Sequence, residues 1–416
     1  MDEGLRPGEL VSELYCHRIK DIATKEWWSL MNKQSKLCQL SVMDMKTSEE
    51  KVVEAFKNYP GKVVTLVNEV LCLSLWRKEV LPALITDPCD KMSSRFPLIY
   101  IIMYHESSMV ALLEIIMFHS EICIALGDAA VDLVDYCAAQ ITRLISRPQK
   151  DESKHEILLQ KEEIEFGIGM RCITIIFYLA ENINSLGLSL TSRIFSTHDF
   201  PLLLCSLIDE QPWIREKNGE KLQFIDGSWH RKCNGSLAGR HEANAWLAVH
   251  QLLLHPELGK FYSVTEYAKG KFMRMETKID DDLVSQMPPL QELKQGLLYL
   301  SNFQLPEQKP PVMLELLPEM TNALLREGIE GWSTIIKIQK KRILEHSDMV
   351  TIADSLPLQE APRNLCTHCT QPAKSRCSKC KIAWYCSRNC QLQHFPYHKI
   401  ECEPVESVGA GRDAEK

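Results

Sequence analysis

Cysteine is concentrated near the carboxyl end of the chain. Seven of the sixteen cysteines lie within residues 366–402, a stretch of 37 positions. They form pairs with metal-ligand spacing, the last pair completed by a histidine: Cys366/Cys369, Cys377/Cys380, Cys386/Cys390 and His398/Cys402. Tetrahedral structural zinc takes four thiolate or imidazole ligands. These eight side chains therefore predict two zinc ions, and the metal must supply most of the folding free energy of so small a segment.

The spacing of the ligands also predicts local structure. The first two pairs have the two-residue gap of loop knuckles, whereas the last two pairs are four residues apart, which places both side chains on one face of a helix. Pro396 suits the first turn of a helix better than its interior, so we expect two short helices with a bend between them. His368 and His394 are further candidate ligands, and spacing alone does not exclude His394.

The order of these residues resembles the MYND-type zinc finger over the whole of residues 366–402. The resemblance implies that one zinc ion is held by Cys366, Cys369, Cys386 and Cys390, and the other by Cys377, Cys380, His398 and Cys402. It makes His394 a packing or hydrogen-bonding residue. Members of this family bind short proline-containing peptides beside an aromatic residue that is usually Trp. The resemblance places this peptide surface near Gln391 and Phe395. Because Phe395 stands where Trp is usual, we expect altered peptide affinity.

Disulfides are the other use of dense cysteine, but two features favour metal. No signal peptide is recognisable, and the nine other cysteines are scattered along the chain, which indicates a reducing compartment.

The net charge differs between segments: residues 366–402 carry +5, the tail 403–416 carries −2 and residues 1–365 carry −10. Because the body is acidic and cations near thiolates offset the charge of a zinc site, we expect no nucleic-acid binding.

Residues 1–346 have a mainly helical apolar pattern, and we expect an irregular armadillo- or HEAT-like helical array. Residues 347–365 are interpreted as a linker, residues 366–402 as the finger and residues 403–416 as a flexible tail. A charged loop is expected near 147–155. No apolar run approaches the length of a membrane helix, so no membrane insertion is expected. The predicted helices cover residues 62–85, 97–146 with a break at Gly127-Asp128, 156–186, 190–208, 242–256, 261–275, 290–303, 311–327 and 329–346.

A small β-hairpin is predicted near residues 221–230, with its turn at Asp226-Gly227.

The body was also searched for catalytic motifs. Gly167 and Gly169 lack the third glycine of a dinucleotide-binding loop and are interpreted as a small-residue helix contact. His241-Glu242 opens a metalloprotease motif, but position 245 is Ala. The Asn-His-x-Cys signature of SET-domain methyltransferases is also absent. The sequence therefore predicts no catalytic residues and no enzyme.

The body carries a second resemblance. The segments PLIYIIMYHESS and STHDFPLLLCSLIDEQPW, together with FIDGSWH and YAKGKFMRM, are similar to MYND-finger axonemal dynein assembly factors. The resemblance implies a cytoplasmic scaffold or co-chaperone-like adaptor, concentrated at centriolar satellites or near basal bodies. Implied partners are chaperones and co-chaperones, other assembly factors including a leucine-rich-repeat protein, and dynein intermediate and heavy chains. The alternative is a nuclear MYND adaptor that recruits transcriptional corepressors through proline-rich peptides.

Overall fold

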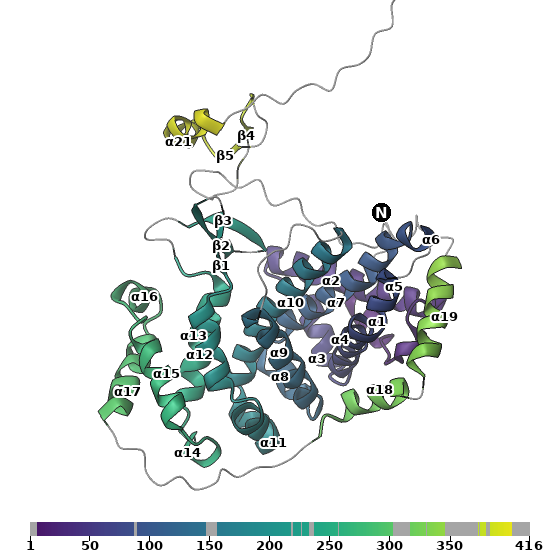
Figure 1. Cartoon of the computed structure of the whole chain (residues 1–416), viewed down its shortest axis with the longest axis horizontal. Coiled ribbons are helices and arrows are strands. Elements are labelled where there is room, and N and C mark those ends of the chain that lie inside the picture. Colours follow the sequence, from purple (N-terminus) through teal and green to yellow (C-terminus); the bar gives the residue numbers. More distant parts are fainter. Residues whose placement is uncertain are drawn as a thin grey trace, which may run out of the picture. The chain divides into compact units, whose positions relative to one another are not determined.

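The computed structural model describes residues 6–86, 90–146, 156–217, 219–225, 227–232, 237–256, 258–302, 317–329, 331–345, 373, 375–379 and 383–401. The chain divides into two compact units, Met1–Ser355 and Leu356–Lys416. The first unit is the helical body and the second contains the cysteine-rich segment (Figure 1). The loop expected near 147–155, the linker at 347–365 and the tail at 403–416 lie outside the described residues.

The amino-terminal part of the body is helical. Thr24 caps the long helix α2, because its hydroxyl accepts a hydrogen bond from the backbone N–H of Trp27. The segment predicted as one helix over 62–85 divides at Val80 into α4 and α5, where Pro82 occupies the first turn of the second helix. The elements are α1 (Pro7–Ser12), η1 (Ile19–Asp21), α2 (Lys25–Thr47), α3 (Lys51–Asn58), α4 (Lys62–Glu79), α5 (Leu81–Ile85) and α6 (Asp90–Ser93).

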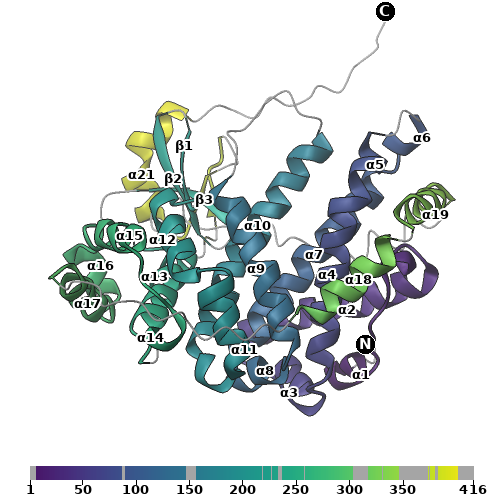
Figure 2. The ribbon, with the colours of Figure 1, turned by 60° about the horizontal axis from the view of Figure 1, so that its bottom comes forward.

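Two long helices form the centre of the body. α7 (Phe96–Ile116) packs against α10 (Glu156–Glu181), and also against α4 and α2 (Figure 2). By length and composition, α7 could cross a membrane. The search of the sequence for uninterrupted apolar runs did not identify this helix. Of its most apolar window, 78% is buried inside the body. This burial is that of a core helix, and most side chains of α7 are covered by other parts of the body.

The predicted break at Gly127-Asp128 is present. Gly127 has φ 52°, in the left-handed region, and α9 (Ala129–Ile145) begins directly after Asp128. The Asp128 side chain makes no capping hydrogen bond. A second break separates α7 from α8 (Ser120–Ala125). The segment expected as one helix over 190–208 is also divided, into α11 (Gly187–Ser192), the π-helix η3 (Arg193–Thr197) and α12 (Phe200–Glu210). Asp199 caps α12 through the N–H of Leu202.

A three-stranded antiparallel sheet interrupts the helices. The predicted hairpin is present as β2 (Glu220–Ile225) and β3 (Ser228–Arg231), with Gly227 at φ 83° in the turn. The sequence analysis missed the additional strand β1 (Ile214–Lys217), which pairs with β2. Its charged composition, IREK, gives no alternating apolar signal. The rings of Phe166, Phe224 and Trp229 join this sheet to α10.

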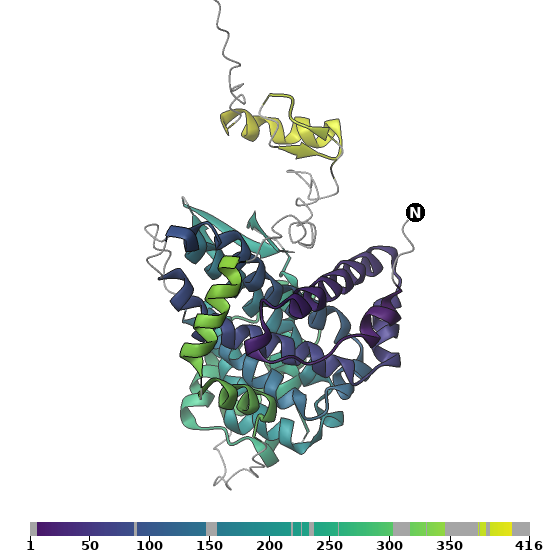
Figure 3. The same cartoon turned by 90° about the vertical axis from the view of Figure 1, so that its right-hand side faces the viewer.

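The later helices of the body extend the array and then return to its beginning. Thr265 and Asp280 cap two of them through backbone N–H groups. α18 contacts α9 and α4, and α19 contacts η1 and α5, so the end of the body packs against its start (Figure 3). The predicted start of α18 at Pro311 lies outside the described residues. These helices are α13 (Arg240–Leu253), α14 (Leu258–Phe261), α15 (Glu266–Glu276), α16 (Asp281–Gln286), α17 (Leu290–Asn302), α18 (Glu319–Ile329) and α19 (Trp332–Glu345).

The mainly helical fold class predicted from the sequence is confirmed. Helix length varies from four residues in α6 to 26 in α10. The described helices therefore do not repeat a unit of constant length, and an irregular array is the better description of the body.

Candidate metal centre

The second unit contains a short hairpin followed by a helix. Strand β4 (Ser375–Arg376) pairs antiparallel with β5 (Trp384–Tyr385), and α21 (Arg388–Glu401) follows directly. Ser387 caps the helix, because its hydroxyl accepts a hydrogen bond from the N–H of Cys390 at 3.3 Å. The cap fixes the first turn of α21 beside the hairpin. Cys386 and Cys390 are thereby placed one turn apart.

The core of this unit is very small. Cys377, Ala383 and Tyr385 are buried, and Cys386 and Cys390 pack against them. The N–H of Cys377 donates to the carbonyl of Ala383 at 2.7 Å, which closes the hairpin. Among the described residues of this unit, three buried apolar side chains supply far less burial than an independent domain needs. A core of this size is typical of a unit that bound metal stabilises.

The two thiols of the Cys386/Cys390 pair lie together. Their Sγ atoms are 3.5 Å apart. Two thiolates bound to one zinc ion at about 2.3 Å in tetrahedral geometry would be about 3.8 Å apart. The pair therefore fits a shared zinc ion with a small adjustment of side-chain torsion. These sulfurs would serve as two of the four ligands, and the metal would act as a structural cross-link.

Two histidines of α21 occupy different environments. The hydroxyl of Tyr385 and Nδ1 of His394 are 3.0 Å apart, at hydrogen-bonding distance. The His394 and His398 rings stack with their centroids 5.8 Å apart. The rings of Tyr385 and His398 are in a T-shaped arrangement, with their centroids 6.2 Å apart. His398 is buried, whereas His394 is half-buried. Tyr385 therefore orients both rings, and the sequence analysis assigned it no such role.

The bend predicted at Pro396 is wrong. α21 continues from Arg388 to Glu401 without interruption. Proline inside a helix removes one backbone hydrogen bond. An unbroken helix, however, keeps Cys390, His394 and His398 on the face that packs against the hairpin, and their contacts offset part of this cost.

The described residues include half of the predicted ligands. Cys377, Cys386, Cys390 and His398 are described, whereas Cys366, Cys369, Cys380 and Cys402 lie outside the described residues. Within the described part of the chain, no three His, Cys, Asp or Glu side chains form a metal-binding group. Each proposed four-ligand set includes two residues from the part that is not described.

The outer face of α21 carries exposed apolar side chains. Phe395 is 51% exposed and Leu392, one position after Gln391, is 61% exposed. Gln391 itself is half-buried. The residues predicted to contact a peptide therefore lie on an accessible part of the helix, and Leu392 is a further exposed apolar side chain there, which the sequence analysis did not single out.

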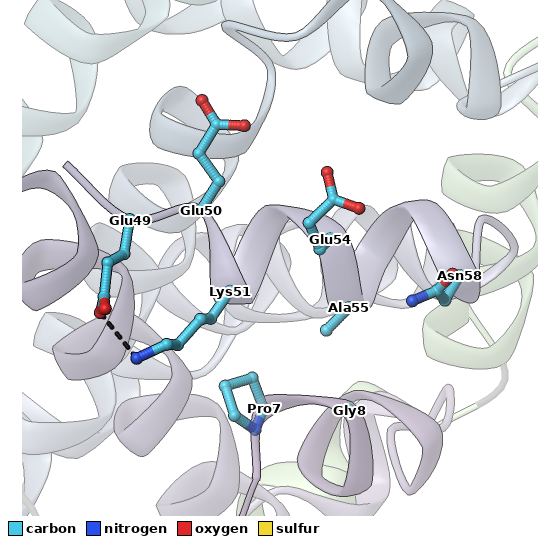
Figure 4. A pocket seen from close by; sticks show the side chains of 8 residues that line it. All are labelled: Pro7, Gly8, Glu49, Glu50, Lys51, Glu54, Ala55 and Asn58. Carbon is cyan, nitrogen blue, oxygen red and sulfur yellow. Dashed lines mark hydrogen bonds and ion pairs between the residues drawn. The ribbon is translucent and has the colours of Figure 1, made fainter.

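Among the described residues, the body contains buried titratable groups and an open cleft, and neither resembles a catalytic centre. His241 in α13 is buried, and desolvation lowers its pKa to about 3, so it remains neutral. The cleft has a volume of about 490 Å³ and lies between α1 and α3 (Figure 4). Lys51 pairs with Glu49 at 2.7 Å within it. Its eight lining residues include no thiol or imidazole; they are Pro7, Gly8, Glu49, Glu50, Lys51, Glu54, Ala55 and Asn58.

Comparison with known proteins separates the finger from the body. Residues 366–402 match the MYND finger family. The human N-lysine methyltransferase SMYD2 is 40% identical over 48 residues, 11% of each chain. The ubiquitin carboxyl-terminal hydrolase 15 of Arabidopsis thaliana is 39% identical over 74 residues, 17% of this chain and 8% of that protein. Because these matches cover so little of either chain, they do not carry catalytic activity to the body.

One relative matches both parts of the chain. The zinc finger MYND domain-containing protein 10 homolog of Drosophila melanogaster is 28% identical over 446 aligned positions, which cover 96% of each chain. No solved structure matches the chain. The ligand pattern, the small hairpin-and-helix unit and this long alignment agree: the chain contains a MYND finger at residues 366–402 and is similar over almost its whole length to the zinc finger MYND domain-containing protein 10 homolog.

Proposed function

We propose that the chain is a non-enzymatic adaptor for the cytoplasmic preassembly of axonemal dynein arms. The observation that carries the proposal is the similarity to the Drosophila protein over 96% of both chains, body and finger together. The body segments that resemble MYND-finger dynein assembly factors supply the link to dynein. The helical body offers an extended surface for partner chains, and the finger adds a second docking surface.

The proposed partners follow from the same resemblance. They are chaperones and co-chaperones, other assembly factors including a leucine-rich-repeat protein, and dynein intermediate and heavy chains. The proposed location is the cytoplasm, with concentration at centriolar satellites or near basal bodies. Two weak sites on one chain strengthen each other, because the first contact raises the effective concentration for the second.

The finger acts in this proposal as a structural module with two zinc ions. One ion is held by Cys366, Cys369, Cys386 and Cys390, and the other by Cys377, Cys380, His398 and Cys402. The 3.5 Å separation of the Cys386 and Cys390 sulfurs supports the first set. When bound, zinc supplies cross-linking rather than chemistry, since four protein ligands leave no coordination position for a substrate. Gln391, Leu392 and Phe395 are the proposed peptide contacts on α21.

The experiment is capture of bound proteins from cells that build motile cilia. The full chain is compared with a Cys377→Ala/Cys380→Ala variant, and Cys16→Ala serves as the control because Cys16 is an exposed cysteine outside the finger. We expect dynein chains and chaperones on the full chain and on the control, with fewer on the finger variant. Undiminished capture on the finger variant would assign the partners to the body. Chromatin regulators in their place would favour the nuclear adaptor and refute the dynein proposal.

A further inference from the structure

The last two helices of the body pack on elements from its beginning. α18 contacts α9 and α4, and α19 contacts η1 and α5. Figures 2 and 3 show both helices in light green on the surface of the body, outside the central helices. We call Glu319–Glu345 the strap, and the surface that it covers the strap groove. The strap groove is formed by residues that precede the strap by more than a hundred positions.

α19 sits in the strap groove through one narrow stripe. Ile335, Gln339 and Ile343 are its buried residues, spaced four apart. Gln339 has no exposed surface: its Oε1 accepts a hydrogen bond from Trp76 Nε1 at 2.6 Å, and its Nε2 donates to the carbonyl of Ile19 at 2.7 Å. A buried amide satisfied at both ends is specific for one register, because any shift would leave two polar groups unpaired.

A cation next to the stripe adds a further contact. Arg342 donates through Nη1 to the carbonyl of Lys20 at 2.5 Å and to that of Ile22 at 3.3 Å. The part of the strap groove under α19 therefore binds a helix with apolar side chains at positions i and i+8, an amide at i+4 and a cation at i+7. This spacing is that of a helix lying in a groove.

α18 is held mainly by its amino-terminal end. The buried carboxylate of Asp132 accepts hydrogen bonds from the N–H of Thr321 at 2.9 Å and of Met320 at 3.4 Å. The body thereby supplies acceptors to N–H groups in the first turn of this helix. The Thr321 hydroxyl is buried and has no hydrogen-bond partner among the described residues, which weakens this seat. Leu324 is buried among the side chains of α18 whose burial the structure describes.

The strap buries far fewer side chains than the core helices. α19 buries three residues, whereas α7 buries fifteen. Segments with few buried apolar contacts open locally at a lower free-energy cost than the whole domain. When the strap leaves, Trp76 Nε1, the carbonyl of Ile19 and the carboxylate of Asp132 lose their partners within the body. These groups then form a preorganised set of donors and acceptors.

We propose that the strap is a removable cover, and that the uncovered strap groove binds an amphipathic helix of a partner protein. The partner helix presents apolar residues at i and i+8, Gln or Asn at i+4 and Arg or Lys at i+7, the pattern that α19 itself uses. Binding of partner and strap is mutually exclusive. The inference rests on the contacts of the body alone, so it stands or falls separately from the proposed dynein function.

Hydrogen exchange of the zinc-loaded full chain tests the first half of the proposal. Gln339→Ala removes both amide contacts, whereas Lys337→Ala changes an exposed residue of the same helix and serves as the control. We expect exchange of strap amides to rise roughly tenfold or more in Gln339→Ala, with α7 and α10 unchanged and the control equal to the native chain. A rise that spreads to α7 and α10 would make the strap part of the cooperative core and overturn the proposal, as would no rise.

A peptide added in trans tests the second half. A labelled peptide of residues 332–345 is titrated against the native chain and against a Gln339→Ala/Ile343→Ala chain with a weakened strap. We expect roughly tenfold or tighter binding to the weakened chain, and loss of that preference when the peptide itself carries Gln339→Ala. Equal affinity for the two chains would refute competition for the strap groove. Binding that does not depend on the amide would refute the proposed partner pattern.

Discussion

The Arg77 guanidinium donates two parallel hydrogen bonds to the Glu106 carboxylate, at 2.7 and 2.8 Å, inside the core of the body. Arg77 is 3% exposed and Glu106 is fully buried. Tyr136 donates to the same carboxylate at 2.8 Å, and Glu165 also pairs with Arg77. Burial disfavours the charged guanidinium, but the Glu106 charge more than compensates, so the pKa of Arg77 is raised. This network joins α4, α7, α9 and α10 at one point.

Replacing Glu106 alone should lower the free energy of unfolding more than replacing Arg77 and Glu106 together. Glu106→Leu leaves a buried guanidinium without its bidentate partner, and we expect a loss of about 3–5 kcal/mol in the free energy of unfolding. Arg77→Met/Glu106→Leu should be less destabilised than Glu106→Leu, because no charge is then stranded. Chemical denaturation of the three chains measures both quantities. A double variant that loses as much stability as Glu106→Leu, or more, would contradict this account.

His17 should make the stability of the body depend on pH. Burial opposes protonation of His17, but the Glu69 carboxylate at 2.5 Å and a bond to the Arg18 carbonyl raise its pKa to about 9. Because the folded pKa exceeds the unfolded value near 6.5, the stabilisation is complete below pH 6.5 and is lost as pH rises toward 9. Its size is on the order of 3 kcal/mol. The difference in unfolding free energy between native and His17→Gln chains should therefore shrink between pH 6.5 and 9.

His105, beside the same carboxylate, should act in the opposite direction. Desolvation lowers its pKa to about 4, so it is neutral in the folded body. Unfolding takes up a proton below pH 6.5, and stability therefore falls between pH 6.5 and 4. His105→Asn should therefore reduce the fall in unfolding free energy between pH 6.5 and 4 and leave its pH dependence above 6.5 unchanged. A change confined to pH values above 6.5 would show that the two histidines are assigned wrongly.

Gly167 and Gly169 should respond differently to the same substitution. A Cβ on Gly169 would lie 2.5 Å from Leu144 Cγ, where α9 and α10 pack closely. On Gly167 it would meet only the end of the flexible Arg171 side chain at 3.3 Å. We expect Gly169→Ala to destabilise the body by about 1–3 kcal/mol. Gly167→Ala should be neutral or stabilising by up to about 1 kcal/mol, since alanine favours helix. Equal melting temperatures for the two variants would exclude close packing at Gly169.

Zinc content should distinguish His394 from the predicted zinc ligands, here represented by Cys377. Because His394 Nδ1 lies at hydrogen-bonding distance from Tyr385, His394→Ala should retain two zinc ions per chain by elemental analysis. Cys377→Ala should lose zinc and unfold the finger, while the thermal transition of the body persists because the two units are separately compact. One zinc ion in His394→Ala would make His394 a ligand. Joint melting of body and finger in Cys377→Ala would refute their independence.

The secondary structure was predictable where the signal was local. The hairpin turn at Gly227 and the break at Gly127 were both anticipated, because each requires a positive φ that glycine adopts at low cost. The division of the segment 190–208 was not anticipated, because Asp199 adopts the left-handed conformation, which sequence does not signal as glycine does. Strand β1 was missed because its pairing with β2, rather than its own composition, makes it a strand.

The sequence by itself determined the helical class of the body, the MYND identity of the finger and its set of candidate ligands, because periodicity, glycine turns and cysteine spacing are local properties of the chain. Only the tertiary structure showed that α21 runs through Pro396, that Arg77 meets Glu106 and that Gln339 reaches Trp76 and Ile19. These contacts join residues brought together by packing. A buried polar side chain looks like a surface residue in the sequence until its partners, distant along the chain, are placed around it.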